Sequence, residues 1–231
     1  MELVTPGPEV KIIPAESNMG IVFKYLHNMD KYEIRADIDQ VVGTKRGTIL
    51  GLNNEKIYTV EHILSALYGL EIDNAIIKID NIELPILDGS TYEYVKKIKE
   101  VGIKKLNDKK NYLIIKDKID VSQGNSTLTI LPYNGFKISY SLDYNNKSIG
   151  KQNFILESLD NYKNEISKSR TFCTFSEIKN LQNDGLAKGG NLNNAIIYID
   201  DNTTIDEIKK FNKTSSIKIE EPNSINNSKN L

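Results

Sequence analysis

The sequence predicts an α+β protein made of two duplicated α/β two-layer sandwich domains, each a sheet packed against helices, with the second domain incomplete. Short β-branched runs alternate with amphipathic helical stretches along most of the chain. A polar break at "LNDKKN" (106–111) separates two halves with a similar order of elements. The segment "DNAIIKID" (73–80) is echoed by "NNAIIYID" (193–200). These observations predict domains at 1–106 and 111–211, although a short Asn-rich echo can also arise by chance.

The first domain is expected to begin with strands. Residues 8–26 carry two β-branched runs around a polar turn at Gly20, and "YEIRADIDQVV" (32–42) alternates like a further strand. A helix is expected over 60–69, with Thr59 as its N-cap. The apolar positions that predict this helix are Val60, Ile63, Leu64 and Leu67.

The end of the first domain is predicted as a strand, a turn and a helix. "NAIIKI" (74–79) is the strand, and "PILDGS" (85–90) is the turn. Ser90 and Glu93 have the spacing of a capping box, and Gly102 has the place of a helix terminator.

The second domain repeats this pattern. "YLIIKDKI" (112–119), "STLTIL" (126–131) and "FKISYSL" (136–142) predict strands. "TFSEIKNLQNDGL" (174–186) predicts a helix, and "NAIIYID" (194–200) predicts a strand. The helix has Thr174 and Glu177 as its capping box and Gly185 with Leu186 as a Schellman ending.

The remainder of the chain is polar. "TTIDEIKKF" (203–211) predicts one short helix. Residues 212–231 are rich in Asn and Ser and hold few apolar side chains, so they are predicted to be a flexible tail.

Composition excludes several classes of protein. With 231 residues, 39% hydrophobic and 26% charged, the chain is typical of a soluble globular protein. A net charge of -1 gives no basis for binding nucleic acid or a membrane surface. No apolar run approaches the roughly 18 residues of a transmembrane segment, and the N-terminus lacks a signal-peptide pattern. The single cysteine, Cys173, excludes an intrachain disulfide and a Cys-rich zinc cluster. A cytoplasmic protein is therefore expected.

The pair Glu61-His62 at the start of a predicted helix has two interpretations. In the first, the imidazole binds zinc and the carboxylate takes a proton from metal-bound water. In the second, Glu61 complements the positive end of the helix dipole, and His62 is an ordinary polar residue. The dipeptide alone does not decide between them, because a catalytic zinc site needs three protein ligands.

Longer segments carry a resemblance to a known family. The segments are "TVEHILSALYGLEIDNAIIKIDNIELPILDGS" (59–90), "PYNGF" (132–136), "SRTFCTFSEIKNLQNDGLAKGG" (169–190) and "NLNNAIIY" (191–198). Together they resemble the signature of UDP-3-O-acyl-N-acetylglucosamine deacetylases, the zinc amidases of lipid A biosynthesis. Their order and approximate spacing agree over most of residues 8–200. The resemblance implies two α+β domains related by duplication and a UDP-linked acylated amino sugar as substrate.

The resemblance also implies roles for single residues. His62 matches the first zinc-binding histidine, and Glu61 matches the carboxylate that activates water. Thr171 in "SRTF" matches a hydroxyl near the carbonyl under attack; it is otherwise a strand threonine.

Other positions match residues around the site, each with a plainer alternative. Asp88 matches an acidic residue that supports the site, or it is a turn aspartate. Phe172 matches a pocket-lining aromatic, or it belongs to the core. Lys188, Gly189 and Gly190 are expected either to approach a phosphate or to form a plain turn. Cys173 is expected to be a buried apolar residue, because no histidine follows it.

The sequence departs from the family pattern in ways that affect the chemistry. The other two zinc ligands of the family lie in a later His-Lys-x-x-x-Asp segment, followed by a catalytic histidine, and no histidine follows His62 here. A first strand and a "GLH"-type motif are also missing, and His27 lies in a predicted turn. The sequence therefore predicts a truncated or degenerate member with weak zinc binding. The alternatives are an enzyme completed by a partner chain and an inactive homologue that acts as a binding or regulatory module.

Overall fold

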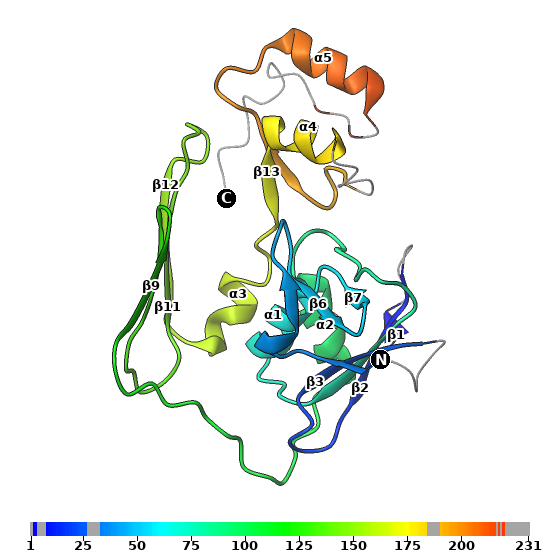
Figure 1. Ribbon diagram of the computed structural model, residues 1–231, viewed down its shortest axis with the longest axis vertical. Coiled ribbons are helices and arrows are strands. Elements are labelled where there is room, and N and C mark those ends of the chain that lie inside the picture. Colours follow the sequence, from blue (N-terminus) through cyan, green and yellow to red (C-terminus); the bar gives the residue numbers. More distant parts are fainter. Residues whose placement is uncertain are drawn as a thin grey trace.

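A five-stranded sheet forms the centre of the first half of the chain (Figure 1). The computed structural model describes residues 2–3, 8–26, 33–183, 190–215, 217 and 219. All neighbouring strands are antiparallel except β3 and β8, which are parallel. In spatial order the strands are β1 (Glu2–Leu3), β2 (Val10–Pro14), β8 (Ala75–Ile79), β3 (Ile21–Tyr25) and β4 (Glu33–Arg35). The predicted strands in 8–26 and 74–79 are confirmed.

Two helices, α1 (Glu61–Gly69) and α2 (Tyr92–Val101), lie side by side and pack against this sheet. Each buries one apolar stripe, as its sequence period requires. The stripes share one core with the sheet, where Phe23 and Ile77 are fully buried. The helix side chains of that core are Ile63, Ala66, Leu67, Tyr94, Val95 and Ile98. Helices over 60–69 and 90–102 are thus confirmed, and Gly102 ends α2 with a φ of 91°.

A second, smaller sheet lies before α1. It consists of β5 (Val41–Gly43), β6 (Ile49–Leu52) and β7 (Glu55–Ile57). The prediction of one strand over 32–42 was wrong. Asp37 caps a 3-10 turn at Ile38–Gln40, and this turn separates β4 from β5. The hairpin β6–β7 was not predicted, although Asn53-Asn54 is a turn signal and both residues adopt positive φ.

The capping predictions for α1 and α2 were wrong. Thr59 has a φ of 61°, and its hydroxyl donates to Glu83 2.8 Å away, so it cannot cap α1. Ser90 accepts a hydrogen bond from Tyr92 N at 3.1 Å rather than from Glu93. In both cases a tertiary partner or a local turn takes the side chain that the sequence pattern assigned to the cap.

Two separate hairpins follow the first unit. One is β9 (Ile119–Gln123) with β10 (Ser126–Ile130), and the other is β11 (Ile138–Asp143) with β12 (Lys151–Leu156). The predicted strands at 126–131 and 136–142 are confirmed, whereas β12 was not predicted. The strand at 112–119 was wrong, since only its last residue, Ile119, lies in a strand. Residues 112–114 are 74–90% exposed, so burial gives no reason for them to pair.

The last described part is a β-α-β unit with a further helix (Figure 1). Its elements are β13 (Phe172–Thr174), α4 (Phe175–Asn183), β14 (Ile196–Tyr198) and α5 (Ile205–Thr214), and the short helix α3 (Tyr162–Glu165) precedes them in the chain. β13 and β14 are parallel, and α4 connects them. The capping box of α4 is confirmed: Thr174 N donates to Glu177 at 2.8 Å and Glu177 N donates to Thr174 Oγ1 at 3.3 Å. Gly185 and Leu186 lie outside the described residues.

The small core of this part lies between α4 and α5. Phe175, Ile208 and Phe211 are buried there, and the two phenyl rings meet edge to face at 5.2 Å. Ile217 and Ile219 belong to the same cluster. The tail expected from residue 212 therefore begins inside α5, and most of its length lies outside the described residues.

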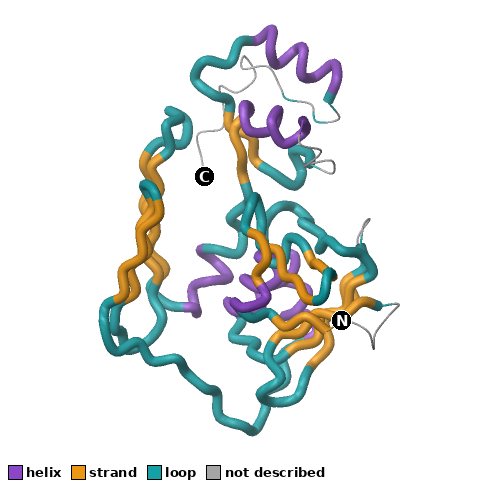
Figure 2. Tube along the Cα trace, viewed as in Figure 1, coloured by secondary structure: helices purple, strands orange, loops and turns teal. Residues whose placement is uncertain are grey.

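The α+β class agrees with these elements, in which helices and small sheets alternate (Figure 2). The two echoed segments have different surroundings, however. β8 is central in a five-stranded sheet, whereas β14 pairs with β13 in a sheet of two strands among the described residues. Within the part of the chain that the structure describes, no helix has both the length and the apolar composition that crossing a membrane requires.

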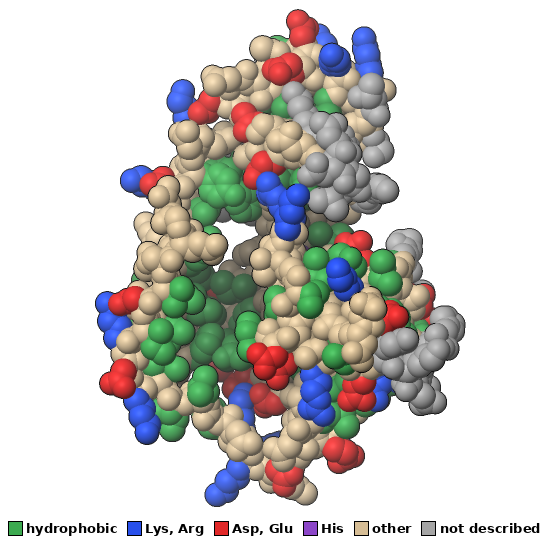
Figure 3. Space-filling model, in the orientation of Figure 1, with side chains coloured by type: hydrophobic (Ala, Val, Ile, Leu, Met, Phe, Trp, Pro, Cys, Tyr) green, Lys and Arg blue, Asp and Glu red, His purple; other side chains and the backbone are tan. Residues whose placement is uncertain are grey.

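The two hairpins present apolar side chains to solvent. Cross-strand partners share a face of a hairpin, so the pairs Ile119–Ile130 and Val121–Leu128 make one apolar face. These four side chains are 38–63% exposed. Figure 3 shows hydrophobic side chains gathered on this side of the molecule, along the hollow beside the hairpins. The opposite face is polar, with Ser122 hydrogen-bonded to Thr127.

This apolar face is expected to bind the dye ANS. Replacing Val121 and Leu128 together by threonine, which keeps the β-propensity, should lower the dye fluorescence with little change in Tm, because little buried area is lost. The matched control, Ser122→Ala with Thr127→Ala on the opposite face, should leave the fluorescence unchanged. Equal fluorescence in all three proteins would mean that another surface binds the dye.

Candidate functional site

The loop between β5 and β6 holds the carboxylate of Glu61. Glu61 is the first residue of α1 and is partly buried. Its Oε2 accepts a hydrogen bond from Thr48 N at 2.9 Å. A Cβ added to Gly47 would lie 3.2 Å from Glu61 Oε1, so the loop backbone lies close to the carboxylate. The carboxylate is therefore fixed at the N-terminal end of the helix, where its charge is favourable.

His62 follows on the same turn of α1 and is partly buried. Adjacent helical residues project about 100° apart, so His62 and Glu61 face different directions from one helix end. Among the described residues, no group of three or more His, Cys, Asp or Glu side chains is placed to hold a metal ion. His27 lies outside those residues.

Asp88 closes the turn that begins α2. Its Oδ1 accepts hydrogen bonds from Ser90 N at 3.0 Å and from Ser90 Oγ at 2.7 Å. Ser90 is fully buried, and its Oγ also accepts from Tyr92 N. Asp88 therefore stabilises the turn, as turn aspartates commonly do, and both hydrogen bonds use the same carboxylate oxygen, Oδ1.

The structure brings Thr171 to this turn. Thr171 N donates to Gly89 O at 2.7 Å, and Thr171 O accepts from Ile196 N at 3.0 Å. Arg170 spans the same junction: Nε donates to Asp88 O at 2.7 Å and one terminal nitrogen donates to Leu192 O at 2.9 Å. A Cβ on Gly89 would overlap Asn194 O. Thr171 and Asp88 are thus neighbours across a tightly packed junction between the two halves of the chain.

Phe172 and the last predicted residues lie further along. The Phe172 ring meets the rings of Tyr144 and Tyr198, each with centroids 5.6 Å away. Phe172 is only partly buried, so both predicted roles fit its position. Lys188 and Gly189 lie outside the described residues, and Gly190 begins the segment that leads to the Asn194 contact.

An ion pair ties the Glu61 loop to α4. Arg46 in this loop lies 2.9 Å from Glu177 Oε1. Burial alone would raise the pKa of Glu177, but the hydrogen bond from Thr174 N and the charge and hydrogen bond of Arg46 outweigh it and lower the pKa below 4.5. Nearby, burial and the Glu177 charge raise the pKa of the Cys173 thiol to about 11. Cys173 is therefore a buried thiol with little thiolate, as the sequence predicted.

Replacing Arg46 with alanine is expected to cost about 0.5 kcal/mol at pH 7, because the half-exposed guanidinium is screened by solvent. Glu177 has a depressed pKa, so its contribution is present above pH 4.5 and is lost as the pH falls through its folded-state value. Urea denaturation at pH 7 and pH 3 measures the difference. Lys151→Ala, which removes a pair that is 79% and 67% exposed, is the control and should change nothing measurable. A cost that persists at pH 3 would contradict this account.

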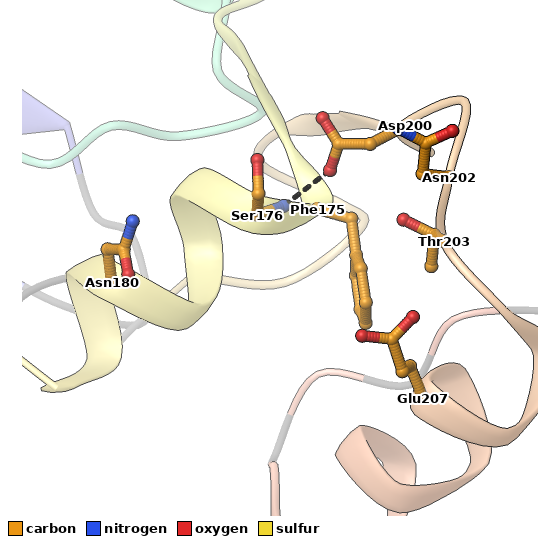
Figure 4. Close-up of a pocket in the computed structure, with 7 residues that line it drawn as sticks. All are labelled: Phe175, Ser176, Asn180, Asp200, Asn202, Thr203 and Glu207. Carbon is orange, nitrogen blue, oxygen red and sulfur yellow. Dashed lines mark hydrogen bonds between the residues drawn. The ribbon is translucent and has the colours of Figure 1, made fainter.

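A cavity of about 320 Å³ lies elsewhere, between the N-terminal ends of α4 and α5 (Figure 4). Ser176 N donates to Asp200 Oδ2 at 2.6 Å on one side, and Glu207 faces it from α5. The other lining residues are Phe175, Asn180, Asn202 and Thr203. None of the predicted site residues lines this cavity, so it is separate from the Glu61 loop and the Asp88 turn.

The sequence did not indicate which residues hold the predicted site residues in place. Thr48 and Arg46 lie in a loop that no pattern singled out, and Asn194 was quoted within longer segments without a role of its own. Arg170 was part of the quoted "SRTF" segment, but nothing in a linear sequence shows which carbonyl groups its guanidinium reaches. A long-range contact of this kind follows from the fold alone.

Comparisons with known proteins give consistent matches. The family described as "LpxC: UDP-3-O-acyl N-acetylglycosamine deacetylase" matches residues 7–213. A bifunctional enzyme LpxC/FabZ of Chlorobaculum tepidum is 39% identical over 190 residues, 81% of this chain and 41% of that protein. UDP-3-O-acyl-N-acetylglucosamine deacetylases of Syntrophus aciditrophicus and Helicobacter pylori are 38% and 37% identical, over 88% and 87% of this chain. The chain spans 63% and 68% of those two relatives.

Proposed function

This chain belongs to the family of UDP-3-O-acyl-N-acetylglucosamine deacetylases, and from this we propose that it binds the UDP-linked, 3-O-acylated N-acetylglucosamine after which its relatives are named. We place it in the lipid A biosynthesis of a bacterial cytoplasm. The reaction consumes water: its oxygen adds to the N-acetyl carbonyl, the C–N bond breaks, and acetate and a free amine result. Glu61, His62, Asp88 and Thr171 are the residues that we assign to this site.

The position of Glu61 is the observation that carries the proposal. A general base must present its carboxylate in a fixed direction at hydrogen-bonding distance from the water it activates. Glu61 lies at a helix start, and Thr48 N holds one of its oxygens at 2.9 Å. The other oxygen is left to accept a proton. Thr171, fixed through its backbone beside Gly89, has a hydroxyl that can donate to a carbonyl oxygen.

Zinc does not fit the described residues by themselves. A catalytic zinc site takes three protein ligands, and His62 is the one histidine that the structure describes. No group of three ligand side chains lies in the described part of the chain. We therefore assign no step to a metal. We propose that further ligands come from a partner chain, and that the chain by itself turns over substrate near the background rate.

The ligand count also supports a second candidate function, a binding or regulatory module that keeps the fold and the sugar-binding surface without catalysis. The two candidates share the substrate class and differ in turnover. For both, we propose that the second half derives from a duplication of the first and that Phe172, Lys188, Gly189 and Gly190 line the ligand site.

Two measurements on the purified chain test these proposals. Calorimetric titration with the UDP-linked substrate should detect binding, and UDP-glucose is the control for the 3-O-acyl group. A product assay with added zinc should detect no amine above the level of Glu61→Gln. Binding without turnover supports a shared substrate class. Turnover that Glu61→Gln abolishes would establish the enzyme and overturn the expected lack of activity, and absence of binding would overturn the substrate assignment itself.

A further inference from the structure

Tyr162 is the first residue of α3, and α3 lies beside α1, the helix that carries Glu61 and His62 (Figure 1). The side chain is 5% exposed. A Cβ on Gly69, the last residue of α1, would overlap its ring, so the glycine provides the space that the ring occupies. The second half of the chain is therefore packed directly on α1 at this point.

The hydroxyl of Tyr162 lies between two others, and their donors and acceptors can be ordered. Ser65 Oγ is 2.7 Å from it, and Thr91 Oγ1 is 2.9 Å from it. Thr91 Oγ1 donates its single proton to Ser167 O at 3.2 Å. Because a hydroxyl has one proton to donate, Thr91 accepts from Tyr162, and Tyr162 accepts from Ser65. The result is a directed chain of hydrogen bonds from Ser65 through Tyr162 and Thr91 to the Ser167 carbonyl.

Both ends of this series of hydrogen bonds lie in segments that carry assigned site residues. Ser65 lies one helical turn after Glu61 and His62. Thr91 directly follows the Asp88 turn, and its backbone N also donates to Ser167 O at 3.1 Å. Four residues beyond Ser167 the backbone of Thr171 is hydrogen-bonded to the same turn. The tyrosine hydroxyl thus connects α1 with the Asp88 turn and, through Thr91, with the segment before β13 that contains Thr171.

We propose, on the basis of the function proposed above, that Tyr162 is a positioning residue. Its hydroxyl fixes the first turn of α1 relative to the Asp88 turn and Thr171, and so fixes the directions in which Glu61 and His62 point. Buried polar groups in a complete network hold a specific geometry, and removal of one member leaves the others without a partner.

The test uses Tyr162→Phe, which keeps the ring over Gly69 and removes the hydroxyl. NMR provides two local readouts that need neither substrate nor turnover: the imidazole signals of His62, assigned with His62→Gln, and the exchange rate of the Thr48 amide that bonds Glu61. The control is Tyr94→Phe, which removes another hydroxyl of a fully buried tyrosine, bound to Pro85 O at 2.7 Å, at a site off α1. A second pair of variants tests the same hydrogen bonds at Thr91. Thr91→Val removes the hydroxyl that bonds Tyr162, and Thr91→Ser keeps it.

Tyr162→Phe and Thr91→Val are expected to shift the His62 signals and to speed Thr48 exchange at least about tenfold, as loss of one well-made hydrogen bond near 1.4 kcal/mol would do. Thr91→Ser should restore both readouts, and Tyr94→Phe should lower Tm without moving either. Unchanged readouts in Tyr162→Phe, or equal changes in Tyr94→Phe, would overturn the proposal. If Tyr162→Phe does not fold, Thr91→Val compared with Thr91→Ser tests the proposal by the same two readouts. A failure to bind substrate would refute the proposed function and leave this result unaffected.

Discussion

Replacing Gly89 with alanine is expected to destabilise the protein by about 3 kcal/mol. Gly89 has a φ of 85°, and a side chain in this left-handed region costs about 1–2 kcal/mol. The added Cβ would also overlap the Asn194 carbonyl oxygen, a backbone atom that cannot rotate away. Forced overpacking costs about 1–3 kcal/mol more. Thermal melting should show a fall in Tm on the order of 10 °C for a chain of this size.

Gly102→Ala separates the two causes. Gly102 has a similar φ of 91°, but no atom lies within 4 Å of an added Cβ. With a ψ of 166°, its substitution measures backbone strain without a clash and should cost about 1–2 kcal/mol. If the two variants prove equally stable, the junction between the Asp88 turn and the 190–196 segment does not pack as described.

After dialysis against zinc-free buffer, the chain is expected to retain far less than one zinc ion per molecule. Most of the binding free energy of a protein zinc site comes from several deprotonated ligands acting together. His62 is the one histidine that the described residues provide, and Asp88 already accepts two hydrogen bonds within its turn. Metal analysis of the dialysed protein measures the content directly.

The control for this measurement is His62→Ala. It should hardly change the residual zinc, because a single imidazole contributes little affinity by itself. One zinc ion per molecule that disappears in His62→Ala would show that other side chains complete the site. His27→Ala would then test the second histidine of the sequence as one of those ligands.

Local sequence signals predicted the elements that depend on local chemistry. The box of Thr174 and Glu177 correctly placed the start of α4, and Gly102 the end of α2, because both depend on residues within one turn. The same argument failed for Thr59, whose hydroxyl bonds Glu83 from another segment. Periodicity also failed at 112–119, where only Ile119 pairs with a strand among the described residues and residues 112–114 stay exposed.

In the candidate site, too, the local residues could be predicted and the long-range contacts could not. The resemblance suggested roles for Glu61, His62, Asp88 and Thr171, and the fold places the last two at one junction. What holds them could not be predicted. Thr48 acts through its backbone N–H, which every non-proline residue has, so no residue type marks it. Tyr162 is distinguished by what lies 71 and 97 positions away, and one sequence contains no information on such pairs.

The single thiol, Cys173, can report how often the smaller core, between α4 and α5, opens to solvent. Cys173 lies in the cluster with Phe175 and Ile208, and at neutral pH almost none of it is ionised, because its pKa is about 11. A disulfide reagent can react only while β13 is detached and the thiol has its ordinary acidity. The labelling rate, divided by that of the unfolded chain, therefore equals the fraction of time that this part is open. The larger core contains no cysteine, so opening of that core does not contribute to the measured labelling rate.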